Sequence, residues 1–286
     1  MNTISIKNDF LTVKINTAGA QIDSVKSKSG TEFMWSADPD VWGHSAPILF
    51  PICGALKNDS YILDGKSYNL TKHGFVRRAP FEVKSLEDTR AVLAVKDTEE
   101  TKKVYPYEFE FEAVFELEEN SLKVSYNVKN NSDKTMYYSV GCHEAYACPE
   151  GIEEYDVEFP KECDFVNYLT EGPLISGKTE LFMKGEKVIP LKVKYFEVDS
   201  LVFKNLGVHS ACLKHKNSDK KITIDFPGFE YFLFWQMAGA KYICLEPWKG
   251  FPDHKDTDGD FTKKDGILTV EPGKTDTSVH TIKFEG

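Results

Sequence analysis

Residues 107–117 read Tyr-Glu-Phe-Glu-Phe-Glu-Ala-Val-Phe-Glu-Leu, an alternation of apolar and acidic side chains that only Val114 interrupts. Successive side chains of a β-strand point to opposite faces of its sheet, so this period of two predicts a strand with one buried and one solvent-exposed face. Residues 118–121 predict a turn, and residues 122–129 then alternate Leu, Val, Tyr and Val with Lys, Ser, Asn and Lys. We therefore predict a long antiparallel hairpin in which glutamates of one strand lie opposite lysines of the other, a mildly stabilising arrangement.

Short β-branched and aromatic segments of the same kind occur throughout the chain. We predict further strands at residues 10–15, 21–25, 61–63, 81–83, 91–95, 136–140, 201–203 and 222–226. Turn-forming pairs such as Asp64-Gly65 and Lys184-Gly185 separate many of them. Sustained helical periodicity is absent, and we expect helical turns only near residues 39–42 and 178–182. The pattern predicts an all-β fold, a large antiparallel sandwich. Without a repeat or a linker, we interpret residues 1–286 as one domain.

The composition favours a globular protein and excludes several kinds of partner. Of 286 residues, 41% are hydrophobic and 28% are charged, as in ordinary globular proteins. The formal net charge of -10 argues against a nucleic-acid partner. No apolar run approaches the roughly 20 residues of a transmembrane helix, and no secretory signal is visible. We therefore expect a cytoplasmic protein with no membrane partner, whose six cysteines are free, packed thiols. The oligomeric state stays open, a homodimer included.

Three segments each place a proton-transfer residue beside a glycine, a proline or an aromatic residue. They are residues 72–77 (Lys-His-Gly-Phe-Val-Arg), 141–144 (Gly-Cys-His-Glu) and 244–253 (Cys-Leu-Glu-Pro-Trp-Lys-Gly-Phe-Pro-Asp). Histidine has an unperturbed pKa near neutrality, which suits His73 and His143 to acid–base work. Glu246 lies in a mostly apolar run and is a candidate for a partly buried base. Long strand-like stretches separate the three segments, so we predict that different strands bring them to one cleft, where they could act as acid and base on a sugar.

The ordered set of motifs resembles the aldose 1-epimerase (galactose mutarotase-like) family, in particular its bacterial LacX-like branch. The matching segments are residues 50–56, 64–68, 73–77, 141–143, 199–203 and 246–248. No single motif is specific, but their order and spacing cover most of the chain. The resemblance implies a large supersandwich of antiparallel strands, in agreement with the alternation above.

The same resemblance implies roles for four residues in sugar mutarotation. Glu246 looks like the base and His143 like the acid. His73 looks like the residue that binds and polarises the sugar near its anomeric centre, and Asp199 like the one that binds sugar hydroxyls. The reaction is anomer interconversion of a small-molecule sugar, and it needs no cofactor or metal.

Two further residues are candidates for substrate binding, each with a structural alternative. Arg77 could contact an anionic group or a sugar hydroxyl, or form a structural ion pair. Trp248, like Trp35, Trp42 and Phe251, could stack on a pyranose or pack in the core.

The chain departs from the family pattern at two positions. Ala55 lies near a position that is often Arg, and Glu144 follows His143 where Pro is common. We predict that the Glu144 carboxylate raises the pKa of the neighbouring histidine.

We expect neither a zinc site nor a calcium site. Cys142, His143 and Cys148 lack a second ligand pair with zinc spacing. Residues 256–260 (Asp-Thr-Asp-Gly-Asp) lack the full spacing and the terminal Glu of a calcium loop. Whether the acidic loop 253–260 binds a cation stays open.

Two other functions compete with aldose 1-epimerase activity. A hexose-6-phosphate 1-epimerase would need basic residues near the cleft, for which Arg77 and Arg78 are available. A non-catalytic carbohydrate-binding protein of the same fold would not require an acid–base pair, so His73, His143 and Glu246 argue against it.

Overall fold

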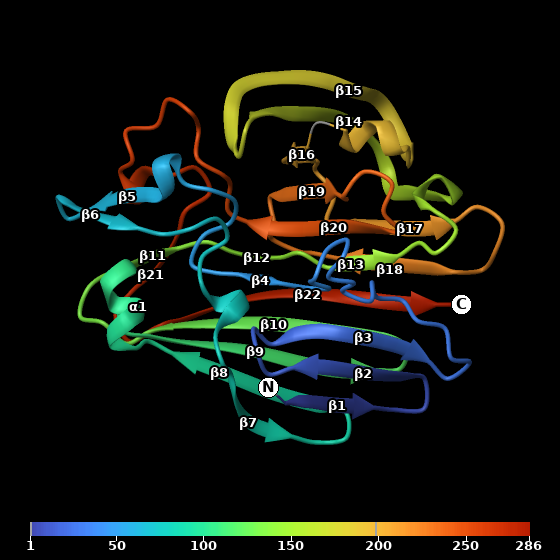
Figure 1. Ribbon diagram of the computed structural model, residues 1–286, viewed down its shortest axis with the longest axis horizontal. Helices are drawn as coiled ribbons and strands as arrows, with labels where there is room; N and C mark the ends of the chain where they lie inside the picture. Colours follow the sequence, from blue (N-terminus) through green and yellow to red (C-terminus); the bar gives the residue numbers. More distant parts are fainter. Residues whose placement is uncertain (1, 198) are drawn as a thin grey trace.

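Antiparallel strands dominate the computed structural model, which describes residues 2–197 and 199–286 (Figure 1). The strands of the first half are β1 (Thr3–Lys7), β2 (Leu11–Asn16), β3 (Gln21–Ser27), β4 (Ile48–Leu49), β5 (Ser60–Leu63), β6 (Lys66–Asn69), β7 (Glu82–Leu86), β8 (Arg90–Lys96), β9 (Phe109–Glu118), β10 (Ser121–Asn130), β11 (Met136–Tyr138) and β12 (Val140–Cys142). Those of the second half are β13 (Ala145–Ala147), β14 (Tyr155–Glu171), β15 (Leu174–Pro190), β16 (Leu201–Lys204), β17 (Ser210–His215), β18 (Lys221–Asp225), β19 (Tyr231–Trp235), β20 (Tyr242–Lys249), β21 (Leu268–Val270) and β22 (Thr275–Glu285). The helical elements are α1 (Glu99–Val104) and the short 3₁₀ helices η1 (Lys57–Asp59), η2 (Val76–Arg78), η3 (Ile152–Glu154), η4 (Val193–Phe196) and η5 (Phe261–Lys263).

Fifteen strands form one sheet, whose main path runs β4-β12-β20-β19-β16-β14-β17-β18-β22-β10-β9-β8-β7. Strand β13 pairs beside β20 and β15 beside β14, while β1–β2–β3, β11–β21 and β5–β6 form small sheets. The long hairpin β14–β15 arches over β16 and β19 at the top of Figure 1. The largest cluster of buried apolar side chains draws on residues from Ile6 to Phe284. The predicted antiparallel β-supersandwich is therefore confirmed.

The hairpin that the alternating sequence predicts is confirmed as β9–β10. Phe111 lies opposite Val128, and Phe115 opposite Val124, on the buried face. On the exposed face Lys123 Nζ lies 3.1 Å from Glu116 Oε2. Because this ion pair is exposed to solvent, it contributes about 1 kcal/mol at most.

Three local predictions differ from the structure. Residues 178–182 lie within β15 and form no helical turn. The predicted strand 136–140 is two short strands, β11 and β12, with different partners. Helix α1 was missed because its six residues are too few to show a period, although Thr98 and Thr101 form a capping box at its start. Near residues 39–42 the Trp42 amide donates to the Asp38 carbonyl, which makes the expected helical turn.

All six cysteines are unpaired, and five of them are buried. Within residues 2–197 and 199–286, the helices are too short and too polar to span a bilayer.

Candidate active site

Strand alternation separates the residues of the central strands into a pocket face and a core face. On β20, Glu246 and Trp248 line a cavity, whereas Leu245, the residue before Glu246, belongs to the hydrophobic core. His143 follows β12 and lines the same cavity, while its neighbour Cys142 packs in the core. This two-residue period is the local reason why a charged residue and a histidine in apolar runs both face the cavity.

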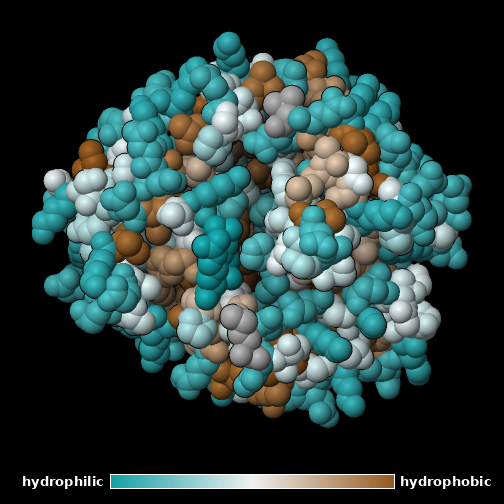
Figure 2. Space-filling view, viewed as in Figure 1, coloured by the Kyte–Doolittle hydropathy of each residue, from teal (hydrophilic) through white to brown (hydrophobic). Residues whose placement is uncertain are grey.

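The cavity holds about 210 Å³ and gathers segments that are far apart in the sequence. It is lined by Trp42, His44, Pro47, Gly54, Lys72, His73, Arg77, His143, Thr170, Pro173, Asp199, Ser200, Val202, Leu233, Trp235, Glu246, Trp248 and Pro252. A recess is visible near the middle of the face shown in Figure 2, among mostly hydrophilic side chains. All six residues predicted for the site, from His73 to Trp248, thus line one cavity.

His143 and Glu246 are in direct contact at the buried end of the cavity. Nδ1 of His143 lies 3.4 Å from Oε1 of Glu246, and the two residues are 9% and 1% exposed. Neither His143 Nδ1 nor Glu246 Oε2 has a hydrogen-bond partner among the described residues. Unpaired buried polar atoms are costly, so their presence here marks groups that face a ligand.

Burial shifts the pKa values of these two groups in opposite directions. It raises the pKa of Glu246 well above its ordinary value; Glu144 and Asp199 add to this shift, and Lys72 opposes it. It lowers the pKa of His143 to about 3, helped by the positive charge of Lys72. The prediction that Glu144 raises the pKa of His143 is therefore wrong. Burial thus disfavours the charged form of both groups and favours an uncharged acid beside a neutral imidazole.

His73 is held in a tight turn that turns its ring toward the cavity. His73 and Gly74 both have positive φ, 68° and 67°. A Cβ at Gly74 would lie 2.2 Å from the carbonyl oxygen of Phe50, so only glycine fits there. Nδ1 of His73 accepts a hydrogen bond of 3.1 Å from the Gly54 amide. Burial lowers the pKa of His73 well below its ordinary value, so the ring is neutral and its proton lies on Nε2, ready to donate.

Trp248 and Arg77 each have one hydrogen bond that fixes the side chain. Trp248 Nε1 donates to the Cys142 carbonyl at 3.0 Å, which leaves the indole ring beside the His73 ring at a centroid distance of 5.5 Å. Arg77 donates from one terminal nitrogen to the Lys72 carbonyl at 3.1 Å. The structure shows no ion pair of Arg77 within residues 2–197 and 199–286, which contradicts the ion-pair alternative.

Several cavity residues were not singled out from the sequence. Lys72 belongs to the same segment as His73, but its position next to His73 in the sequence does not predict that its charge lies at the cavity. Trp235 lies on β19 opposite Cys244, and its ring is 5.4 Å from that of His143. Trp42, a candidate for sugar stacking or for core packing, has its ring 5.0 Å from that imidazole. The two indole rings also contact each other, with a centroid distance of 5.3 Å, so they pack together against one side of the imidazole.

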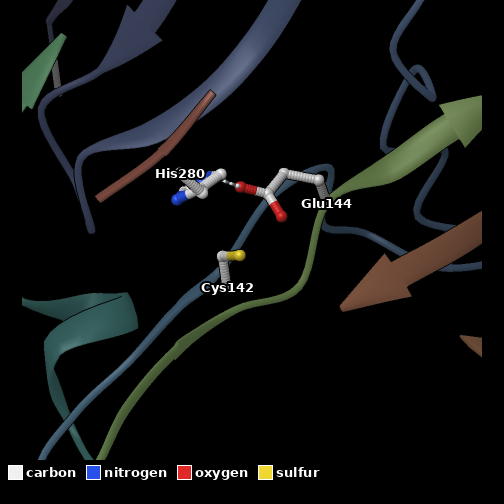
Figure 3. A group of neighbouring side chains, drawn as sticks. All are labelled: Cys142, Glu144 and His280. Atoms are coloured by element: carbon white, nitrogen blue, oxygen red, sulfur yellow. Dashed lines mark hydrogen bonds and ion pairs between the residues drawn. The ribbon is translucent and has the colours of Figure 1, made fainter. Parts of the chain in front are cut away.

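Cys142 and Glu144 lie together with His280 (Figure 3), in a cluster that does not include His143. Glu144 Oε1 and His280 Nε2 share a hydrogen bond of 2.8 Å, and both residues are buried. Cys142 and His143 belong to different clusters, and neither cluster contains Cys148. These three residues therefore do not form a zinc site.

Ligand-like atoms do meet in two buried clusters, Cys142–Glu144–His280 and His143–Cys244–Glu246. Burial raises the pKa of both Cys142 and Cys244 well above the ordinary value. This shift disfavours the thiolate form that binds zinc.

Protein donors already occupy several carboxylates of the acidic loop 253–260. Lys264 Nζ lies 2.9 Å from Asp253 Oδ1, and both side chains are buried. Asp260 accepts from the Thr262 amide and pairs with Lys263 Nζ at 2.7 Å. These contacts favour an internally bonded loop over a cation site.

Comparison with known proteins gives a consistent picture over the whole chain. A sequence profile of the family described as aldose 1-epimerase matches residues 2–281. The chromosomal protein LacX of Lactococcus lactis subsp. lactis is 32% identical, with 98% of each chain covered. A solved galactose mutarotase related enzyme from Lactobacillus acidophilus is 33% identical, with a TM-score of 0.94 over 100% of this chain and 98% of that one. A galactose mutarotase-like protein from Lactobacillus casei ATCC 334 is 27% identical, with a TM-score of 0.93 over 99% and 100% of the two chains.

Proposed function

The chain belongs to the aldose 1-epimerase family, and we propose that it interconverts the α and β anomers of an aldohexose or a related sugar. Glu246 and His143 are the acid–base pair in this proposal, and His73 donates a hydrogen bond to the sugar near its anomeric centre. Asp199, Arg77 and Trp248 border the bound ring. The observation that carries the proposal is the buried contact of 3.4 Å between His143 and Glu246 inside a cavity of monosaccharide scale.

The chemistry needs one proton removed and one delivered. The base takes the proton of the anomeric hydroxyl while the acid protonates the ring oxygen. The bond between the anomeric carbon and the ring oxygen then breaks, and the anomeric carbon becomes an aldehyde. Rotation about the adjacent carbon–carbon bond, followed by ring closure with the roles of acid and base exchanged, gives the other anomer.

An uncharged acid beside a neutral imidazole suits this cycle. The neutral pair and its tautomer, a carboxylate beside an imidazolium, contain the same number of protons. Ring opening moves one proton from the acid to the sugar and one from the sugar to the base, and ring closure reverses both transfers, so that no proton from solvent is needed. Each group of an acid–base pair contributes typically about 10²–10⁴-fold to a rate.

A sugar phosphate is the second candidate substrate, because of the charges at the cavity. Lys72, Arg77 and His44 all line it. Burial lowers the pKa of Arg77, as expected of a guanidinium without a carboxylate beside it. A phosphate would supply the missing counter-charge. A third candidate, a carbohydrate-binding protein without activity, leaves the buried acid–base contact unexplained.

NMR exchange spectroscopy tests the three candidates together. The exchange rate between anomeric signals is measured for glucose, galactose and their 6-phosphates, with and without protein. Faster exchange of the free sugars supports the proposal, and faster exchange of the phosphates alone supports the second candidate. Binding without faster exchange in any sugar overturns catalysis.

A further inference from the structure

A buried ion pair lies just outside the lining of the candidate active site. Lys264 Nζ is 2.9 Å from Asp253 Oδ1, and the two side chains are 3% and 5% exposed. Lys264 also donates to the Phe251 carbonyl. Pro252, the residue before Asp253, lines the cavity, so the pair lies directly behind its wall. Desolvation offsets much of the attraction in a buried ion pair, so net stability alone does not explain its presence.

Each hydrogen-bonding group of Asp253 has a protein partner. Its Oδ1 accepts from Lys264, and its Oδ2 accepts from the Lys57 amide at 3.0 Å. Its backbone amide donates to the Ala55 carbonyl, and its backbone carbonyl accepts from the Ile175 amide, both at 2.9 Å. Asp253 therefore holds the loop that contains Ala55 and Lys57 at two points.

The same loop fixes the ring of His73. The amide of Gly54, the residue before Ala55, donates to Nδ1 of His73 at 3.1 Å, and its carbonyl accepts from the His73 amide at 2.8 Å. Gly54 and Pro252 pack so closely that a Cβ on Gly54 would lie 2.5 Å from Pro252 Cγ. A displacement of this loop would therefore move the donor that keeps Nδ1 of His73 unprotonated and the ring proton on Nε2.

We infer that Asp253 and Lys264 are positioning residues for His73, and that they keep its ring in the tautomer that donates to the sugar. The role toward the sugar rests on the proposed function, whereas the effect on the ring can be measured in the free protein. If the loop shifts, Nδ1 loses its donor and can take the proton, which leaves Nε2 as an acceptor. An acceptor there cannot polarise the sugar oxygen that the donor would contact.

Substitutions at Lys57 break one contact in this network and leave the ion pair in place. Lys57→Pro removes the amide that donates to Asp253 and the side chain that donates to the Thr257 carbonyl at 3.1 Å. Lys57→Ala is the matched control, because it removes only the side chain. Proline is compatible with this position, since Lys57 is the first residue of η1 and Leu56 before it is extended, with φ -95° and ψ 152°.

The kinetic test asks whether the lost amide acts through His73. We expect kcat/KM for the best sugar to be about tenfold lower in Lys57→Pro than in Lys57→Ala, because small misplacements of a catalytic-site group are costly. In the His73→Asn background the same comparison should give less than about a twofold difference. A tenfold difference that persists in that background would overturn the inference, as would equal kcat/KM in the two Lys57 variants.

Long-range proton–nitrogen NMR of the free protein gives a readout that needs no turnover. The His73 ring signals are assigned by their loss in the His73→Asn protein. We expect the ring proton on Nε2 in wild type and Lys57→Ala, and a measurable fraction on Nδ1 in Lys57→Pro, Asp253→Asn and Lys264→Met. If no sugar is converted, this change still supports the positioning role, and only the proposed function fails. An unchanged His73 tautomer in Lys57→Pro, with wild-type circular dichroism, overturns the inference.

Discussion

Replacing Glu246 with glutamine removes one member of the acid–base pair and keeps its shape. The side chain is 1% exposed, so water cannot take over the lost role. His143, whose pKa is lowered to about 3, is neutral and has no proton to deliver once Glu246 is gone. We therefore expect kcat to fall by about 10²–10⁴-fold. At about 1.4 kcal/mol for each factor of ten, this is roughly 3–5.5 kcal/mol of the activation free energy.

The assay is NMR exchange between the anomers of the best substrate, with sugar affinity measured by titration on the same samples. Affinity should change little, because the amide retains the size and one acceptor of the carboxylate. Glu230→Gln is the control: it makes the same chemical change on an exposed side chain. Wild-type exchange in the Glu246→Gln protein, with the fold verified by circular dichroism, would refute Glu246 as a catalytic group and favour the binding-protein alternative.

Four further predictions follow from the same geometry. His143→Asn should lower kcat by about 10² or more, whereas His73→Asn should weaken both affinity and rate because it removes a donor to the sugar; NMR exchange and titration measure both. The profile of kcat/KM against pH should be bell-shaped. Activity should fall on the acid side as His143 gains a proton near its pKa of about 3, and on the alkaline side above the raised pKa of Glu246. A loss of activity that already begins as the pH is lowered through 6.5 would contradict this. Treatment with EDTA should leave the exchange rate unchanged, because burial keeps the Cys244 thiol protonated; loss of activity that zinc restores would contradict this. Lys264→Met should lower the free energy of unfolding by about 3–5 kcal/mol in urea titrations, since it leaves the Asp253 carboxylate buried and unpaired, while the exposed control Lys263→Met should change it by less than about 1 kcal/mol.

The fold could be predicted where the sequence alternates, and was missed where it does not. The β9–β10 hairpin has one exposed face, so its period of two is visible in the sequence. Strand β20 is buried on both faces along most of its length, and its sequence Tyr-Ile-Cys-Leu-Glu-Pro-Trp-Lys shows no alternation. The hairpin β14–β15 was missed for the opposite reason: β15 is largely exposed and rich in Gly, Lys and Glu, which mask its strand character.

The sequence could predict which residues would line one cavity, but it could not predict the pKa shifts of His143 and Glu246. His73, His143 and Glu246 each lie within two residues of a glycine or a proline, and this signal can be read from the local sequence. The pKa of His143 depends on burial beneath Trp42 and Trp235, and on Lys72 from another loop. None of these distances can be read from one sequence. Adjacency in sequence can even mislead, since Glu144 follows His143 directly but its side chain bonds to His280 in a separate cluster.

The buried pair also connects activity with stability. A carboxyl whose pKa is raised in the folded protein contributes most to stability below its unfolded pKa, near 4.5, and that contribution is lost as the pH rises through the folded value. At neutral pH Glu246 therefore opposes folding. In the proposed reaction, the same desolvation favours the protonated carboxyl that serves as the acid. The large aromatic core of the sandwich offsets this cost, which explains how an unsatisfied acid–base pair persists in the middle of the fold.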